Sequence, residues 1–236
     1  MPARILIGIS TYNEIENVPV LIQQIDQHLP IADILIVDDN SPDGTGNWSQ
    51  KQAEQRDDFH CILREGKLGL GTATIATFQF AIDHGYDFII NMDADMSHRP
   101  EYLPALVEAA RDDVDVSLGS RYIAGGDIVG WPAHRKIMSR GVNTFARLML
   151  GLPTKDCSGS FRCYRIAKLK EIDLQRVRSK GYSFFEEILW HLRHKNARFV
   201  EVPISFHDRE LGKTKINFKE VCNAMLMLFK LAFSRP

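Results

Sequence analysis

Residues 88–100 read FIINMDADMSHRP, an apolar run that ends in two aspartates, Asp93 and Asp95. Alternate side chains of an extended chain share one face, about 6 to 7 Å apart along the backbone, so both carboxylates can reach one cation. Carboxylate pairs suit Mg²⁺ or Mn²⁺ and leave coordination sites open for phosphate oxygens and water. A single Asp-x-Asp also occurs in solvated acidic turns, so the neighbouring sequence must decide between a metal site and a turn.

The sequence on both sides of this stretch predicts an α/β fold. Short runs rich in Ile and Val are typical of buried strands, and segments with helical spacing of apolar residues separate them. Strands are expected at residues 4–10, 34–38, 61–64, 88–92 and 114–119, with helices at 18–29, 72–84 and 100–111. This alternation predicts a mostly parallel central sheet with helices on both faces.

After residue 119 the pattern becomes less regular. A Gly-rich loop is expected at 124–130, helices at 133–149 and 184–195, and a strand at 198–205. An almost wholly apolar stretch, residues 224–233, follows near the C-terminus. It is too short to span a bilayer, but it can lie in a membrane interface or pack on the domain or on a partner subunit.

A second acidic cluster, DDNSPDGT at residues 38–45, ends another expected strand. Ligands of such sheets bind beyond the carboxyl ends of the strands, so both acidic clusters are expected at one edge. Two acidic strand ends repel unless a cation joins them, which favours the metal interpretation of Asp93 and Asp95. Asp39 can then accept hydrogen bonds from a base or a ribose, whereas residues 42–44 are typical of a turn.

The segment GKLGLGTAT, residues 66–74, contains two closely spaced glycines, Gly69 and Gly71. A dinucleotide-binding motif needs a third glycine, and a phosphate loop needs a Gly-Lys-Ser/Thr sequence; neither is present. We therefore expect these glycines to form a tight strand-to-helix turn that passes near the ligand.

The 236 residues carry a net charge of −1, and 44% of them are hydrophobic, as expected for one globular domain. There is no basic stripe interleaved with aromatic residues, so no nucleic acid partner is expected. Residues 1–118 hold 7 of the 29 Lys and Arg but 20 of the 30 Asp and Glu. The acidic half can hold a divalent cation, and the basic half phosphates or an anionic membrane; alternatively, the two halves simply attract each other.

The four cysteines are scattered without a CxxC pair, and no signal peptide precedes the first expected strand. We therefore expect reduced thiols in a cytoplasmic protein. No apolar run reaches the roughly 18 residues that a membrane-spanning helix needs, so contact with a membrane would be peripheral.

A series of motifs recurs in the order found in a known family. The motifs are STYNE (10–14), VDDNSPDGT (37–45), GKLGLGTA (66–73), DADMSHRP (93–100), GSRY (119–122), HRKIMSRG (134–141), DCSGSFRCY (156–164) and DRELGKTK (208–215). Together they resemble the polyprenol (dolichol) phosphate mannose synthases of glycosyltransferase family 2, from the first strand to the last helix. Ser10 departs from the pattern, because many relatives have proline there.

The resemblance implies a single domain of the GT-A type, the fold of nucleotide-diphosphate-sugar transferases. Its parts would be a nucleotide-sugar-binding half (1–120), an acceptor-side half (121–206), and a lid loop with a C-terminal amphipathic helix (207–236). The implied donor is GDP-mannose and the implied acceptor a polyprenyl (dolichyl) phosphate on the cytoplasmic face of a membrane. A membrane-anchoring partner subunit is a further possibility.

The resemblance also implies a role for each matching residue. Those expected to bind the donor are Tyr12, Glu14, Val37, Asp39, Asp93, Ala94, Asp95, Arg209 and Lys215. Those expected on the metal are Asp93, Asp95 and Ser97, the last directly or through water. Those expected to receive the acceptor phosphate are Arg121, Arg135 and Ser139. The catalytic set would be Asp95, Arg121, Arg135, Arg209 and Lys215.

The charges suit this chemistry. A divalent ion, Arg209 and Lys215 can stabilise the negative charge that grows on the departing nucleotide, and residues 212–215 are expected to form a lid ordered by the donor. A phosphate monoester acceptor is largely ionised near neutral pH, with a second pKa of about 6, so no general base is required. Arg121 and Arg135 have planar groups suited to phosphate, but either can instead pair with an acid such as Asp127.

Three alternatives stay open. The first is glucosyl transfer from UDP-glucose to a polyprenyl phosphate, and the second is polysaccharide extension. The third is a catalytically silent subunit that binds nucleotide sugars. A hydroxyl acceptor would need a carboxylate base that the sequence does not identify. A silent subunit would have no need to keep both the acidic pair and the four cations of the implied catalytic set.

Overall fold

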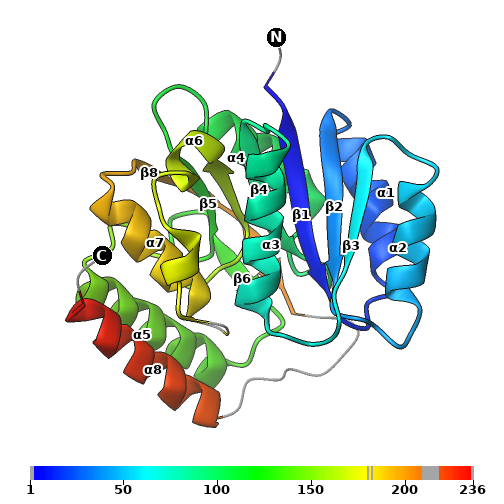
Figure 1. The fold of residues 1–236 in the computed structure, drawn as a ribbon. Coiled ribbons are helices and arrows are strands. Elements are labelled where there is room, and N and C mark those ends of the chain that lie inside the picture. The colour runs from blue at the N-terminus through cyan, green and yellow to red at the C-terminus, as the bar shows by residue number, and fades with distance from the viewer. Residues whose placement is uncertain (1–2, 180, 182, 209–217, 235–236) are drawn as a thin grey trace.

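The computed structural model describes residues 3–179, 181, 183–208 and 218–234, and it leaves out the side chains of residues 218–224. Over these ranges, the chain forms a seven-stranded sheet with helices on both faces and a separate two-stranded sheet (Figure 1). The predicted α/β class and mostly parallel sheet are thus confirmed. Arg209 and Lys215 lie outside the described residues, as does the predicted lid around Gly212 and Lys213.

The first part of the chain alternates strands and helices. Its elements are β1 (Ile5–Thr11), α1 (Val18–His28), β2 (Ala32–Asp38), α2 (Thr45–Ala53), β3 (Phe59–Leu63), α3 (Leu70–Asp83), β4 (Phe88–Asp93), the 3₁₀ turn η1 (Pro100–Tyr102), α4 (Leu103–Ala109) and β5 (Val116–Ser120). The second part continues with β6 (Asp127–Val129), α5 (Ala133–Leu150), β7 (Arg162–Arg165), α6 (Ile166–Leu169), η2 (Leu174–Arg176), α7 (Phe184–His194), β8 (Phe199–Pro203), β9 (Ser205–His207) and α8 (Phe218–Ala232).

The strand order in the large sheet is β3-β2-β1-β4-β7-β5-β8. Only β7 runs antiparallel to its neighbours, β4 and β5. In the parallel part, Thr11 lies level with Asp38, and Ser10 level with Asp93. The two acidic clusters therefore end at one edge, as predicted. Because β7 runs the opposite way, the loop before it ends at this same edge.

Both faces of the sheet are buried, which explains why the neighbouring strands β1 and β2 are almost wholly apolar. In β1, the side chain of Leu6 packs with α3 and α7 on one face, while Ile7 and Ile9 pack with α1 and α4 on the other. Strands from residues 1–120 and from residues 121–206 enter this one sheet. The division of the chain into three functional parts stays a prediction.

Several predicted boundaries are corrected by the structure. The helix predicted at 72–84 begins at Leu70, and the one predicted at 100–111 opens as a 3₁₀ turn and ends at Ala109. The predicted Gly-rich loop contains strand β6, which pairs with β9. The strand predicted at 198–205 divides at Ile204: β8 stays in the large sheet, and β9 joins β6. Ile204 is buried, which anchors the crossing.

Helices α5 and α8 lie side by side at the periphery of the molecule (Figure 1). Phe145 on α5 meets Phe229 on α8 with ring centroids 5.7 Å apart. Several large apolar side chains of this helix pair stay exposed: Ile137, Met138, Leu148, Leu226, Phe229 and Phe233. Across the described part of the chain, no helix is both long enough and apolar enough to cross a bilayer.

Candidate functional site

The acidic pair lies at the end of β4, and each carboxylate is held by its own neighbours. The hydroxyl of Ser160 donates a 2.8 Å hydrogen bond to Oδ1 of Asp93. The backbone N–H of Asp93 donates to Nδ1 of His98 at 3.1 Å, so that ring nitrogen is unprotonated. Burial lowers the pKa of His98, and its ring stacks on Phe161. His98 is therefore a neutral support for the turn between the aspartates.

Asp95 is almost wholly buried. Its Oδ1 accepts a 2.5 Å hydrogen bond from the hydroxyl of Ser97 and a 3.1 Å bond from the backbone N–H of the same residue. Ser97 was expected beside the metal; in the structure, its hydroxyl orients the carboxylate that would bind the metal. Its own contact with a metal stays a prediction.

The side chains at the end of β4 fit a divalent ion that takes some of its ligands from the protein and the others from a substrate. Among the described residues, no group of three or more His, Cys, Asp or Glu side chains is arranged to hold a metal by itself. Asp93 and Asp95 supply oxygen ligands on alternate positions of one turn, the arrangement that Mg²⁺ and Mn²⁺ accept when phosphate oxygens and water complete the shell. A metal held by these two side chains would therefore need further ligands from a substrate or from water.

The aspartates that end β2 have different roles. The buried carboxylate of Asp38 accepts hydrogen bonds from the hydroxyls of Thr11 and Ser41, at 2.8 and 2.6 Å. It therefore ties two loops together. Asp39 forms an ion pair with Arg64, with 2.9 Å between Oδ1 and Nη1. Burial raises the pKa of Asp39, and Arg64 opposes this effect. A nucleoside bound by Asp39 would thus meet a carboxylate that Arg64 already holds in place.

The loop after β1 is fastened to the loop after β2 by short polar side chains. The backbone N–H of Asn13 donates to Ser41, that of Glu14 to Thr45, and that of Ile15 to Asp43. The predicted turn at residues 42–44 thus has a structural role. Of the other residues expected to bind the donor, Tyr12 stacks under Lys67, with Nζ 4.6 Å from the ring centroid, while Val37 and Ala94 are buried.

Gly69 and Gly71 are each required by the fold, for different reasons. Gly69 has φ of 102° and starts α3, as the predicted tight turn requires. A Cβ on Gly71 would lie 2.7 Å from the Phe184 ring and 2.7 Å from the carbonyl oxygen of Ser179. Gly71 is therefore needed for the packing of α3 against the start of α7.

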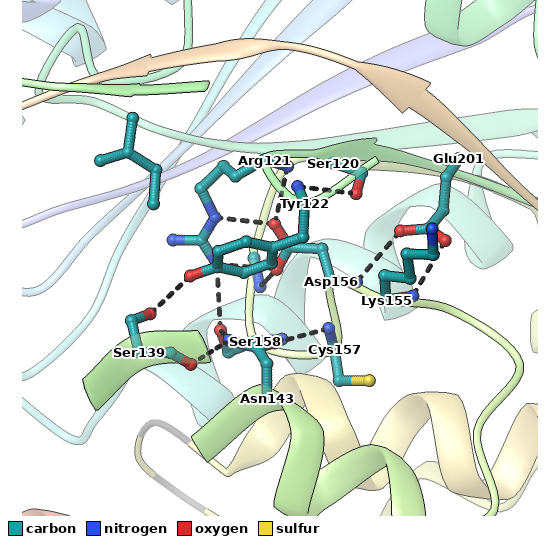
Figure 2. A network of polar contacts seen from close by, with 12 residues as sticks. Ser120, Arg121, Tyr122, Ser139, Asn143, Lys155, Asp156, Cys157, Ser158 and Glu201 are labelled. Atoms are coloured by element: carbon teal, nitrogen blue, oxygen red, sulfur yellow. Dashed lines mark hydrogen bonds and ion pairs between the residues drawn. The ribbon is translucent and has the colours of Figure 1, made fainter. Parts of the chain in front are cut away.

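The side of the site predicted to receive the acceptor is organised by a buried ion pair (Figure 2). Nε and Nη2 of Arg121 each donate a 2.7 Å hydrogen bond to Asp156, and the backbone N–H of Arg121 donates a third. Against the desolvation of both groups, each charge stabilises the other: the pKa of Asp156 is lowered and that of Arg121 is raised. Asp127, the alternative partner considered from the sequence, instead lies 3.9 Å from Lys136.

Two further residues hold the loop that carries Asp156. Oδ1 of Asn143 accepts hydrogen bonds from the backbone N–H groups of Cys157 and Ser158, and its amide nitrogen donates to the hydroxyl of Ser158 (Figure 2). The carboxylate of Glu201 accepts from the backbone N–H groups of Lys155 and Asp156. The loop is thus clamped between α5 and β8.

The other two residues expected at the acceptor phosphate lie on the same side. The hydroxyl of Ser139 is 2.7 Å from that of Tyr122, the residue next to Arg121. Arg135 lies over the Trp131 ring, 3.8 Å from its centroid, and its Nη1 is 3.1 Å from Asp208. The Phe206 ring contacts Trp131 and also lies beneath Arg121. Arg121, Arg135 and Ser139 are therefore joined by one group of aromatic side chains.

Several residues that organise this site have no signal of their own in the sequence. Asp156 stands in a motif of the family resemblance and Asn143 shortly after another, but their partners are 35 and 14 to 15 residues away in the chain. Arg162 is fully buried and donates to the carbonyl oxygens of Cys157 and Phe185. A signal existed only for His98, which follows the acidic pair directly.

Two adjacent glutamates at the start of α7 have opposite environments. Burial raises the pKa of Glu186 to about 7, and its Oε2 has no hydrogen-bond partner among the described residues. Glu187 accepts hydrogen bonds from the backbone N–H groups of Arg178 and Ser179. Against the effect of burial, the neighbouring His191, with Nε2 3.8 Å from Oε1 of Glu187, and these bonds lower the pKa of Glu187.

This contrast predicts opposite effects of pH in two matched variants. Glu186 binds a proton more tightly in the folded chain than in the unfolded chain. As the pH rises from the unfolded pKa of Glu186 to 7, the wild type therefore loses about 3 kcal/mol of its free energy of unfolding. Glu186→Gln should therefore be more stable than the wild type at pH 8 and lose this advantage at pH 4, measured by urea unfolding. Glu187→Gln should be destabilised at pH 8. A stability difference for Glu186→Gln that does not change with pH would contradict this assignment.

Comparisons with known proteins identify the family. A model of glycosyl transferase family 2 matches residues 6–173. The chain is 44% identical to an undecaprenyl-phosphate mannosyltransferase of Micrococcus luteus over 214 residues, covering 91% of this chain and 88% of that protein. It is 40% identical to a polyprenol monophosphomannose synthase of Mycolicibacterium smegmatis over 230 residues, covering 97% and 86%.

Solved structures share the fold at low sequence identity. Glucosyl-3-phosphoglycerate synthase from Mycobacterium tuberculosis, in complex with Mn²⁺, UDP and its product, matches with a TM-score of 0.68 at 14% identity, covering 98% of this chain and 78% of that one. A mannosyltransferase from Pyrobaculum calidifontis, in complex with GDP-Man and Mn²⁺, matches with a TM-score of 0.57 at 15% identity, covering 97% and 72%. The solved structures show the shared fold, and the family model and the two relatives show the family: the chain belongs to glycosyltransferase family 2.

Proposed function

We propose that this glycosyltransferase moves mannose from GDP-mannose to a polyprenyl (dolichyl) phosphate, using Mg²⁺ or Mn²⁺. The relatives from Micrococcus luteus and Mycolicibacterium smegmatis bear names of this reaction, and a structural neighbour holds GDP-Man with Mn²⁺. One contact carries the proposal: Ser160 joins Asp93 to the loop in which Asp156 holds Arg121. The proposed metal ligand and the proposed phosphate ligand are thus one short loop apart.

On the donor side of the site, positive charge would act on the diphosphate, and a carboxylate would bind the nucleoside. A divalent ion bound by Asp93 and Asp95 would supply positive charge to the departing diphosphate. Arg209 and Lys215 would add to that charge from the other side. Asp39 would fix the nucleoside, with Arg64 holding its carboxylate in place, and Tyr12 and Glu14 would lie beside it. The sugar carbon would then face the acceptor side of the site.

On that side, Arg121, Arg135 and Ser139 would receive the acceptor phosphate. Two anions must approach each other for the transfer to occur, and guanidinium groups lower the cost of bringing them together. Arg121 is held rigidly by Asp156, so it would present its remaining donors with little loss of side-chain entropy. A phosphate monoester needs no base to remove a proton before it attacks.

The acceptor would lie in a membrane that the chain contacts peripherally. The exposed apolar side chains of α5 and α8 support this placement, since such helices bury one face in the bilayer interface. The free thiols of Cys61, Cys157 and Cys163 suit the cytoplasmic face. A membrane-anchoring partner subunit on the same helix pair is the alternative use of this surface.

A transfer assay tests the proposal. GDP-mannose, Mg²⁺ or Mn²⁺ and a short polyprenyl phosphate should give a mannosyl phospholipid, and UDP-glucose should give far less product. NMR of the first product should show inversion at the anomeric carbon, because a single displacement reverses it. Retained configuration would contradict a single step. Preference for UDP-glucose would favour the glucosyl alternative, and donor binding without any turnover would favour a silent subunit.

A further inference from the structure

A hollow of about 190 Å³ opens on the flank of α5, bordering the network that holds Arg121. It is lined by Tyr122, Arg140, Asn143, Thr144, Arg147 and Lys155. Ligand pockets for drug-sized molecules are usually about 300 to 1,000 Å³, so this hollow suits a smaller group. A nucleotide sugar would not fit inside it.

The positive charges in the hollow favour the binding of an anion. Three of its lining side chains are cationic, and no carboxylate of the described residues lies within ion-pair distance of Arg140, Arg147 or Lys155. The cations on the other side of α5 differ, because Arg135 and Lys136 both have carboxylate partners. Three clustered cations without a counter-charge repel one another, so an anion bound among them is stabilised.

The uncharged lining residues are already committed elsewhere. The hydroxyl of Tyr122 bonds to Ser139, and the amide of Asn143 bonds to Ser139 and to the Cys157–Ser158 backbone. The hydroxyl of Thr144 donates to the carbonyl oxygen of Arg140. Tyr122 and Asn143 therefore belong both to the lining of the hollow and to the network around Ser139, and the three cations are the groups left to bind a ligand.

The hollow adjoins the exposed apolar side chains of the helix pair. Arg140, Thr144 and Arg147 follow one another at helical spacing on one side of α5, and Leu148, 75% exposed, lies beside them. Phe233, which directly follows the neighbouring α8, is 83% exposed. Cations bordering an apolar helical face are typical of helices that lie in an anionic membrane interface, with the cations at the depth of the headgroups.

We infer that this hollow binds the phosphate headgroup of an anionic phospholipid, at a site separate from that of the acceptor phosphate. The three cations favour an anion, and the volume of the hollow limits that anion to the size of a headgroup. The exposed apolar residues at its border would direct the acyl chains toward the bilayer. The inference rests on the proposed function only in taking a membrane as the source of the acceptor. Bound in this way, a neighbouring lipid would hold α5 against the membrane beside the acceptor.

Binding of soluble short-chain lipids tests the site without any turnover. Dihexanoyl phosphatidylglycerol, below its micelle concentration, should shift the NMR amide signals of Asn143 and Thr144, and dihexanoyl phosphatidylcholine should not. The shifts should persist with citronellyl phosphate, a short acceptor analogue, at saturation. Arg140→Gln and Arg147→Gln should each weaken binding about tenfold, the effect of losing one charge-assisted hydrogen bond.

The matched control variant removes three exposed cations from other faces, Lys51→Gln, Arg111→Gln and Lys170→Gln together, and should bind phosphatidylglycerol as the wild type does. Displacement of phosphatidylglycerol by citronellyl phosphate would assign the hollow to the acceptor and overturn the inference. Equally tight binding of inorganic phosphate would leave a free-anion site and also overturn it. If the control variant bound phosphatidylglycerol as weakly as the Arg140 and Arg147 variants, the effect would come from net charge alone, and this too would overturn the inference. A failed transfer assay would leave all these binding results unaffected.

Discussion

Replacing Asp95 by asparagine should reduce the rate of sugar transfer about a thousandfold or more, because a Lewis-acidic metal supplies several kcal/mol of transition-state stabilisation. The amide keeps the size of the side chain and can still accept hydrogen bonds from Ser97, but it lacks the charge that binds a divalent ion. Steady-state transfer at saturating GDP-mannose measures the loss. Isothermal titration should show donor binding that no longer responds to Mg²⁺ or Mn²⁺.

Two control variants separate loss of the metal from loss of charge. Asp57→Asn removes an exposed carboxylate far along the sequence from the site and should leave the transfer rate unchanged. Ser97→Ala removes the 2.5 Å bond to Asp95 and should cost much less than Asp95→Asn, about 10- to 100-fold, as expected for a residue that orients a metal ligand. Wild-type activity in Asp95→Asn would refute the metal assignment.

Replacing Asp156 by asparagine should destabilise the fold by about 3 to 5 kcal/mol, the usual cost of leaving one charge of a buried pair without its partner. Arg121 would stay buried, having lost the carboxylate to which it makes three hydrogen bonds. Urea unfolding near pH 7 measures this change. The folded pKa of Asp156 is low, so its contribution is present at neutral pH and is lost as the pH falls below about 4.

A double-mutant cycle with Arg121→Met and Asp156→Leu isolates the pair. The double variant should be more stable than Asp156→Asn, since no buried charge is left unpaired. Glu108→Gln, which breaks an exposed pair with Arg111, is the matched control and should change stability by less than about 1 kcal/mol. Additive effects of the Arg121 and Asp156 substitutions would show that the pair is not coupled.

The first half of the fold was predictable because its signals are local. Runs such as residues 34–37 are apolar on both faces of the strand, and each is followed by a helix. The parallel arrangement then brings Asp38 and Asp93 to one edge. Helix ends were less accurate: α3 begins at Leu70 because the positive φ of Gly69 places the turn earlier than apolar spacing alone indicates.

The second half depends on contacts between distant residues. Strand β7 begins and ends with arginine, so it has no apolar run, and the buried Arg162 in it looks like a surface residue in the sequence. The position of β7 between β4 and β5 is set by tertiary packing. The ion pair of Arg121 with Asp156 likewise has no local signal, and only the family resemblance connected the two motifs.

A crystal structure with GDP and Mn²⁺ tests most directly whether the acidic turn after β4 holds the nucleotide through a metal. We expect anomalous density for Mn²⁺ at about 2.1 Å from a carboxylate oxygen of Asp95, with oxygens of both GDP phosphates in the same coordination shell. Diphosphate bound elsewhere, or a manganese ion held by other residues, would contradict that claim.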